Sequence, residues 1–212
     1  VNKSVLISLT ALLIALSLLL PTKAYDFPST TPITKGNTGF SCIYLLTFQH
    51  ESLIPYLKTA ESKKGLYLMD SSFIERNKEV VQLLISQKHA VGLLTNSNTS
   101  EQFEAMILEK EIEQFQKQFQ TVPLWVTTVN GEFEDGLLKA LHTYASNPLA
   151  ATSYFNSNLS LNTIPTGSFI FIEGNQYFNF QSKAHLQLVK STHARSVEEN
   201  LFNLKTKTED MP

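Results

Sequence analysis

Short apolar runs and longer amphipathic stretches alternate along the chain from residue 40 onward. The apolar runs predict buried strands at 42–48, 65–69, 90–94, 123–126, 149–155 and 168–172. The amphipathic stretches predict helices at 53–63, 74–87, 99–119, 133–144, 181–191 and 197–203. Strands that alternate with helices pair in parallel through right-handed crossovers and are buried on both faces. The pattern therefore leaves an open doubly wound sheet or a barrel, and both place ligand sites at the carboxyl ends of the strands.

Composition excludes several classes of protein. The 212 residues suit one domain, and 17 basic against 19 acidic side chains give a formal net charge of −2. We therefore expect no nucleic-acid partner, because such partners are held by an excess of positive charge. The single cysteine, Cys42, excludes an intrachain disulfide and a cysteine-rich metal site. We expect it to be buried in a strand, although an exposed position would allow an intermolecular disulfide.

The first 24 residues have the layout of a secretory signal peptide, with Lys3 before an uncharged run at 5–20 and small residues at the −3 and −1 positions of a cleavage site after Ala24. An uncleaved membrane anchor is the main alternative, although about 20 apolar residues are usual for a membrane span. A buried core helix is less suited to the extreme terminus. The sequence thus predicts a secreted protein, in the cell wall or matrix, with no stable membrane insertion after cleavage.

The rest of the chain divides into a flexible lead-in at 25–39, a domain at 40–205 and a tail at 206–212. Two glycosylation acceptor triplets fit the secretory route, and they begin at Asn98 and Asn158. Asn98 precedes a helix that Thr99 and Gln102 would cap, at the end of the third predicted strand. A glycan on Asn98 would block the mouth of the fold.

Four segments of the domain carry a resemblance to a known family. TFQH at 47–50, KHAVGLLTNSN at 88–98, NGEFED at 130–135 and GSFIFI at 167–172 occur in the order and register of its motifs. The sequence resembles the polysaccharide deacetylases of the NodB-homology type, chitin deacetylases among them. That resemblance implies an α/β fold with a distorted (β/α) barrel, a divalent metal cofactor such as zinc, and chitin or a related wall polysaccharide as partner.

The residues that carry out the family's chemistry are replaced here. The resemblance puts the general base on Gln49 and the metal ligands on His50, Leu94 and Asn98. It puts Thr127 in the place of the arginine that orients the base. Asn130 takes the place of the residue whose backbone holds the oxyanion, and Glu173 that of the catalytic acid. Leucine cannot ligate a metal, glutamine cannot accept a proton, and one histidine falls short of the three ligands usual for catalytic zinc. We therefore expect no cofactor and no deacetylase turnover.

Three functions remain open. The leading one is a non-catalytic wall or matrix protein that binds a polymer of N-acetylglucosamine in the inherited groove, although we expect the candidate aromatics Trp125, Tyr154 and Tyr177 to be buried. The second is an active deacetylase with altered ligands drawn from His50, Glu51 and Glu173. The third is a structural protein without carbohydrate affinity. The mixed charges at 109–111 predict a solvated helix face.

Overall fold

The computed structural model describes residues 31–96 and 102–203. The signal-peptide interpretation, the Asn98 triplet with its helix cap, and the C-terminal tail lie outside these residues. None of the described helices is both long and apolar enough to span a bilayer.

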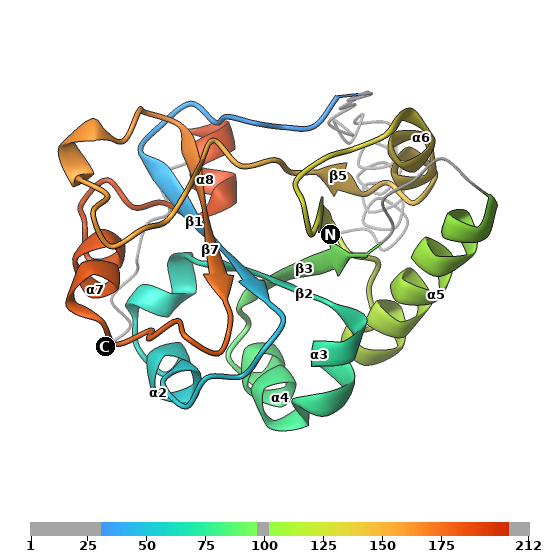
Figure 1. Cartoon of the computed structure of the whole chain (residues 1–212), viewed down its shortest axis with the longest axis horizontal. Coiled ribbons are helices and arrows are strands. Elements are labelled where there is room, and N and C mark those ends of the chain that lie inside the picture. Colours follow the sequence, from blue (N-terminus) through green and yellow to red (C-terminus); the bar gives the residue numbers. More distant parts are fainter. Residues whose placement is uncertain (1–30, 97–101, 204–212) are drawn as a thin grey trace, which may run out of the picture.

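Seven parallel strands form one curled sheet, a half-barrel with helices around it (Figure 1). Their order across the sheet is β5-β4-β3-β2-β1-β7-β6. The strands are β1 Phe40–Leu46, β2 Leu66–Met69, β3 Ala90–Thr95, β4 Trp125–Thr128, β5 Asn147–Pro148, β6 Ser153–Tyr154 and β7 Ser168–Gly174. This architecture confirms the distorted (β/α) barrel and excludes the doubly wound alternative.

The single strand predicted at 149–155 is wrong. Only Ser153 and Tyr154 of this segment form a strand, β6, while the preceding residues Asn147–Pro148 form β5 at the opposite edge of the sheet. Leu149 is fully buried in the barrel, and the chain then crosses the open side of the half-barrel to reach β7. Of this run, Leu149 and Ala151 pack in the barrel core, while Tyr154 is exposed.

Residues 31–39 are fixed against the domain, although we expected them to be flexible. The Ile33 amide donates to the Pro148 carbonyl, and the Ile33 carbonyl accepts from Ala150. The Gly36 amide then donates to the Gly167 carbonyl at the start of β7. This segment, called the strap below, therefore links the edge strand β5 to the start of β7. The Pro/Ser/Thr-rich composition of this segment did not predict these contacts, because backbone groups make most of them.

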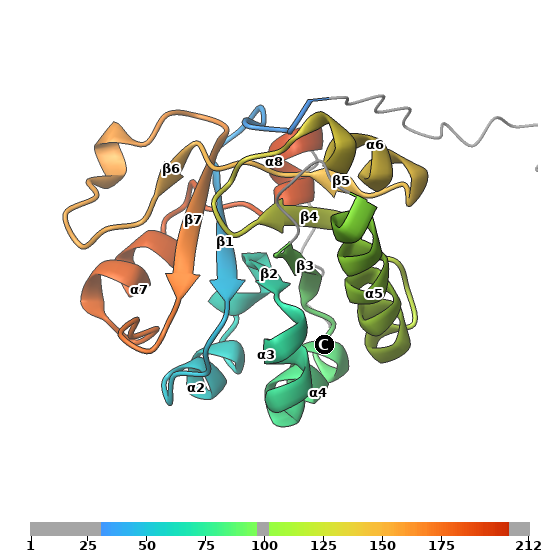
Figure 2. The same ribbon diagram turned by 45° about the vertical axis from the view of Figure 1, so that its right-hand side comes forward.

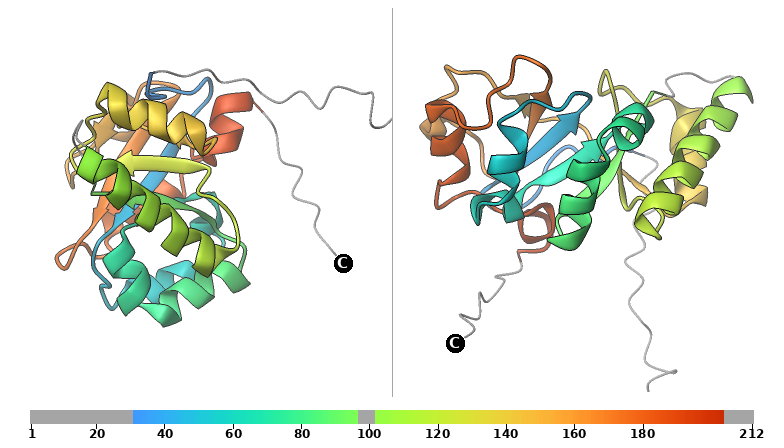
Figure 3. Two further views of the ribbon diagram at one scale, coloured as in Figure 1. Left: turned by 90° about the vertical axis from the view of Figure 1, so that its right-hand side faces the viewer. Right: turned by 90° about the horizontal axis from the view of Figure 1, so that it is seen from below.

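The helices are α2 Leu53–Leu57, α3 Ser71–Arg76, α4 Lys78–Ser86, α5 Gln102–Phe119, α6 Asp135–Thr143, α7 Lys183–Val189 and α8 Val197–Phe202, with 3-10 turns η1 Glu61–Lys64 and η2 Leu161–Thr163. The predicted helix at 53–63 is broken between α2 and η1. The predicted helix at 74–87 begins earlier and is broken at Asn77, whose side chain donates to the Phe73 carbonyl. Such a bond competes with the helical backbone. Figure 3 shows α5 in green and α6 in yellow beside β4.

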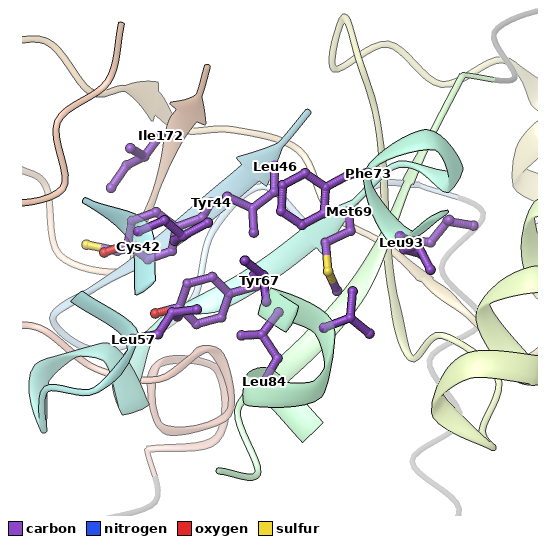
Figure 4. Close-up of a cluster of buried hydrophobic side chains, with 14 of the residues drawn as sticks. Cys42, Tyr44, Leu46, Leu57, Tyr67, Met69, Phe73, Leu84, Leu93 and Ile172 are labelled. Carbon is purple, nitrogen blue, oxygen red and sulfur yellow. The ribbon is translucent and has the colours of Figure 1, made fainter. Parts of the chain in front are cut away.

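Alternate residues of each strand supply two separate cores. On β1, Tyr44 and Leu46 point to the outer face, where they pack with α2, α4 and α7 (Figure 4). Ile43 and Leu45 point into the barrel. The barrel core also contains Leu201 of α8, and Figure 2 shows this helix at the end of the sheet away from the β1 and β7 arrowheads. The amino ends of the strands are thus closed, and the carboxyl ends remain for a site.

Candidate functional site

A hollow of about 270 Å³ lies at the carboxyl end of β7. Its walls are aromatic apart from two polar side chains, and its lining comprises Tyr154, Phe155, Phe171, Glu173, Asn175, Tyr177 and Phe178. Concave sites of this composition, mostly apolar with a few convergent polar groups, are typical of ligand pockets. We refer to it below as the aromatic pocket.

Tyr154 joins this pocket to the end of β4. Its ring stands edge-on to Phe171, with the ring centroids 6.0 Å apart. Its hydroxyl lies so close to Gly131 that a Cβ there would be 3.1 Å from the oxygen. Asn130, one residue earlier, is exposed, and its side chain bonds to Glu132. Of the seven family positions, Asn130 and Glu173 therefore lie on either side of Tyr154.

The pocket's polar groups are held by a local turn. The side-chain nitrogen of Asn175 donates to the Glu173 carboxylate at 3.4 Å. The side-chain oxygen of Asn175 accepts from the Tyr177 backbone amide at 3.0 Å. This turn presents Tyr177, whose side chain is 84% exposed. Tyr154 is 46% exposed, so our expectation of burial is wrong for both tyrosines. It is correct for Trp125, which lies inside the barrel and donates to Glu198 of α8 at 3.1 Å.

Two other family positions have become part of the interior. Leu94 and Thr127 are register partners on β3 and β4, and both are buried. Leu94 packs in the barrel core, while the Thr127 hydroxyl donates to the Leu149 carbonyl at 2.7 Å. That bond fixes the segment that crosses the half-barrel. Positions that the resemblance assigns to a metal ligand and an arginine therefore support packing here.

Gln49 and His50 follow β1 and are half-buried. The Ser52 hydroxyl lies 2.8 Å from Nδ1 of His50 and accepts from the Phe180 amide at 2.9 Å. The hydroxyl therefore donates its own proton to Nδ1, which also accepts from the Ser52 amide. With Nδ1 occupied in this way, His50 orders the start of α2.

The residues do not fit the divalent metal that the resemblance implies. Across the part of the chain that the structure describes, no three side chains of the histidine, cysteine, aspartate or glutamate type are placed to hold one ion. His50, Glu51 and Glu173 thus do not form the altered ligand set considered above. Asn98, the remaining family position, lies outside the described residues.

Glu111 is a polar residue at the barrel mouth that sequence reasoning missed. Its side chain is 6% exposed, so our expectation of a solvated face at 109–111 is wrong at this residue. Its carboxylate accepts from the Thr95 hydroxyl and from the backbone amide of Asn96, at the end of β3. Burial raises the pKa of this carboxyl. Its place among inward-facing residues of α5, between Leu108 and Phe115, was the available signal.

Cys42 and Asn158 differ in accessibility. Cys42 is buried, and burial raises the pKa of its thiol to about 12. The thiol is therefore protonated at neutral pH and placed as a small hydrophobic group, not as a site for an intermolecular disulfide. Asn158 is exposed in a turn where its amide donates to the Asn156 side chain. Its side chain is accessible to modification.

Comparison with known proteins places this geometry in a structural class. No protein-family model and no curated protein sequence matches the chain. Solved structures do. The wild-type BA3943 pseudoenzyme of Bacillus anthracis superposes with a TM-score of 0.69 and 13% identity, over 81% of this chain and 69% of that chain. The chain has the fold of the family 4 carbohydrate esterases.

Two further structures sharpen the comparison. The chitin deacetylase of Colletotrichum lindemuthianum has a TM-score of 0.65 and 15% identity, with 82% of this chain and 92% of that chain covered. A BA3943 mutant described as having restored enzymatic activity has a TM-score of 0.66 and 14% identity, with 79% and 69% covered. The family 4 fold thus occurs in deacetylases and in a pseudoenzyme, and at these identities the likeness establishes the fold alone.

Proposed function

We propose that this chain is a secreted, non-catalytic protein of the cell wall or matrix that binds a polymer of N-acetylhexosamine at the carboxyl ends of its strands. The observation that carries the proposal is the pairing of two features at that end. Leu94 and Thr127, at family positions for a metal ligand and the arginine, are buried in the core, and two exposed tyrosines line a pocket at the carboxyl end of β7. A ligand site thus persists where the means of catalysis do not.

The absence of turnover follows from the chemistry of the residues. Amide hydrolysis on this fold uses a metal to acidify water from a pKa of about 15.7 to about 7 and to polarise the carbonyl. Leu94 offers no ligand, and Nδ1 of His50 is occupied by Ser52. Gln49 cannot take a proton from water. With neither the metal nor the base provided for, the remaining pocket can bind but has no route to hydrolysis.

Two observations favour this polymer as the ligand: the side chains of the aromatic pocket and the proteins of similar structure. Tyrosine presents an apolar ring and a polar tip, which suits the flat faces and hydroxyl groups of a sugar. Glu173 and Asn175 add hydrogen-bonding groups at the pocket's edge. The proteins of similar structure include a chitin deacetylase and a peptidoglycan N-acetylglucosamine deacetylase, whose substrates lie outside the membrane. The N-terminal signal pattern agrees with that location.

Binding tests the proposal most directly. We expect the protein to sediment with insoluble chitin or peptidoglycan, and Tyr177→Ala to weaken binding about fivefold, as is common for an exposed aromatic anchor. Tyr177→Phe keeps the ring and is the matched control, so it should bind within about twofold of the parent. A protein that binds neither polymer would support the structural alternative without carbohydrate affinity and overturn our proposal.

Metal content tests the loss of catalysis. We expect less than one-tenth of an equivalent of zinc, cobalt or nickel per chain after purification and dialysis, because the described residues hold no set of three ligands. Elemental analysis by mass spectrometry gives the ratio. One tightly bound transition metal per chain would instead support the active deacetylase with altered ligands.

Restoring one family residue should not restore activity. Leu94→His returns one imidazole to a position that is 1% exposed in the barrel core, so we expect no acetate release above background. We also expect a loss of about 2 kcal/mol in the free energy of unfolding, because a polar ring replaces a packed leucine. The metal and the general base act together in catalysis, so the effects of restoring single residues are strongly non-additive. Measurable acetate from this variant would contradict the prediction.

A further inference from the structure

A second, larger depression of about 900 Å³ lies outside the barrel, between α7 and the loop that carries η2. In Figure 2, α7 lies below β6 and β7 on the same side of the molecule. Leu161 and Leu186 contribute apolar surface from opposite sides, and Gln181 and Gln187 contribute amides. We refer to this depression as the α7 groove. It contains none of the family positions.

The charge of the α7 groove has one sign. Lys183 and Lys190 are both exposed, and none of the described residues that line the groove is acidic. Seven residues separate them on α7, which puts them on one face of the helix about 10 Å apart. Among the described residues, neither ammonium group has an ion-pair partner. The groove is therefore suited to a ligand with carboxylates at a spacing of about 10 Å and some apolar surface.

The α7 groove and the aromatic pocket are neighbours along two segments of chain. Phe155 lines the pocket and Leu159 lines the groove, so at most about 14 Å of extended chain separates them. Phe178 and Gln181 are related in the same way, at most about 11 Å apart. A single polymer that occupies the pocket can therefore extend a side branch into the groove.

We propose that the α7 groove binds the carboxylate-bearing peptides of a peptide-substituted N-acetylhexosamine glycan, while the glycan itself occupies the aromatic pocket. This inference rests on the proposed function and narrows it, because it selects an anionic glycan of the peptidoglycan type over neutral chitin. Two unpaired lysines would gain partners from such peptides. Chitin has no group to offer them.

The experiment uses three soluble probes: a peptidoglycan fragment with its peptides, a chitin oligosaccharide with the same number of sugars, and the free peptide. We expect the peptide-bearing fragment to bind at least fivefold more tightly than the chitin oligosaccharide. The double variant Lys183→Gln/Lys190→Gln should lose about fivefold in affinity for the fragment at low salt, which is the scale of two exposed ion pairs. Its affinity for the chitin oligosaccharide should not change.

A matched control lies on another helix. Lys110 and Lys117 of α5 are also exposed and seven residues apart, so Lys110→Gln/Lys117→Gln makes the same change in net charge. This control should bind all three probes like the parent protein. Equal losses in the two double variants would mean that only net charge matters and would overturn the inference, as would equal affinity of the parent for fragment and chitin.

The outcomes separate this inference from the proposed function. If the protein bound chitin and the fragment and the α7 lysine variant bound both equally well, the proposed function would be supported and the inference about the α7 groove would be wrong. Binding of the free peptide alone, with no affinity for either glycan, would contradict both proposals, because the groove would then serve a partner that is a peptide and not a wall polymer. Tyr177→Ala should weaken both glycans and leave the free peptide unaffected.

Discussion

Replacing Asn200 with leucine should lower the free energy of unfolding by about 3 kcal/mol. Asn200 lies in α8 with no exposed surface, at the point where three parts of the chain meet. Its side-chain nitrogen donates to the Ser41 hydroxyl at 3.1 Å and to the Ser168 carbonyl at 3.4 Å. Its side-chain oxygen accepts from the Thr38 amide at 3.2 Å. One side chain thus joins β1, β7 and the strap.

The cost arises because leucine removes all three side-chain hydrogen bonds of Asn200 from a buried site, at about 1 kcal/mol each. The Thr38 amide would keep only its bond to the Asn200 backbone carbonyl, and the Ser168 carbonyl would lose the side-chain amide that donates to it. The strap also passes so close that a Cβ on Gly36 would be 2.2 Å from the Asn200 side-chain oxygen. There is no room for a branched apolar side chain to move aside.

Urea titration followed by circular dichroism measures this effect. Asn156→Leu is the control, because Asn156 is exposed and its side chain accepts from only one backbone amide. We expect less than about 1 kcal/mol for the control. Equal small losses in the two variants would show that residues 31–39 add little to stability and that the barrel does not depend on the strap.

The sequence predicted the fold because the periodicity and the order of the apolar runs match the observed elements, even where the predicted boundaries differ from the observed ones. The runs at 42–48 and 168–172 became β1 and β7, which pair along seven register positions. The predicted helix at 181–191 became α7. In each case the signal is local, since inward-facing residues recur at the period of a strand or a helix.

Contacts between distant segments were not predictable in this way. Nothing in 149–155 indicates that its two ends join opposite edges of the sheet, because that result depends on closure of the barrel. The bonds of residues 33–38 are made largely by backbone groups, which any composition can supply. Glu111 looked solvated within its run of charges, but its neighbours on the inner face of α5 bury it.

The candidate site shows the same difference between local sequence signals and contacts of distant segments. The assignment of Leu94 and Gln49 to family positions rests on motif order alone and stays a prediction. The exposure of Tyr154 and Tyr177 could not be predicted, since it depends on a turn that Asn175 builds and on the position of the Asn130–Gly131 segment. The α7 groove was not predicted either, because its two sides come from segments that are separated along the chain, from Asn162 to Gln181.

Lowering the pH from 6.5 to about 4 should destabilise the protein through His185 by about 3 kcal/mol. This residue has no exposed surface, and its Nδ1 lies 2.7 Å from the Phe180 carbonyl while Nε2 lies 2.8 Å from the Tyr44 hydroxyl. The carbonyl can only accept, so Nδ1 carries the proton and Nε2 accepts from Tyr44. Within the part of the chain that the structure describes, no carboxylate is bonded to the ring. Burial lowers the pKa of His185 from 6.5 to about 4.

The sign follows from proton binding. Between pH 6.5 and about 4 the unfolded chain protonates this histidine and the folded chain does not, so stability falls as the pH falls. The contribution is complete above pH 6.5 and is lost by about pH 4. Asp70 and Glu111 act in the opposite direction, because burial raises the pKa of both carboxyl groups. The informative quantity is therefore the difference between the parent and His185→Gln, not the absolute slope.

Urea titrations at pH 7, 5.5 and 4.5 measure that difference. His185→Gln cannot titrate, and we expect its stability relative to the parent to improve steadily as the pH falls through this range. His142→Gln is the control, since it makes the same chemical change at an exposed residue of α6. If His185→Gln kept the parent's pH dependence, burial would not lower the pKa of this ring in the folded protein. The rings of Tyr44, Tyr56 and Phe180 around His185 would then accommodate a positive charge, contrary to our expectation.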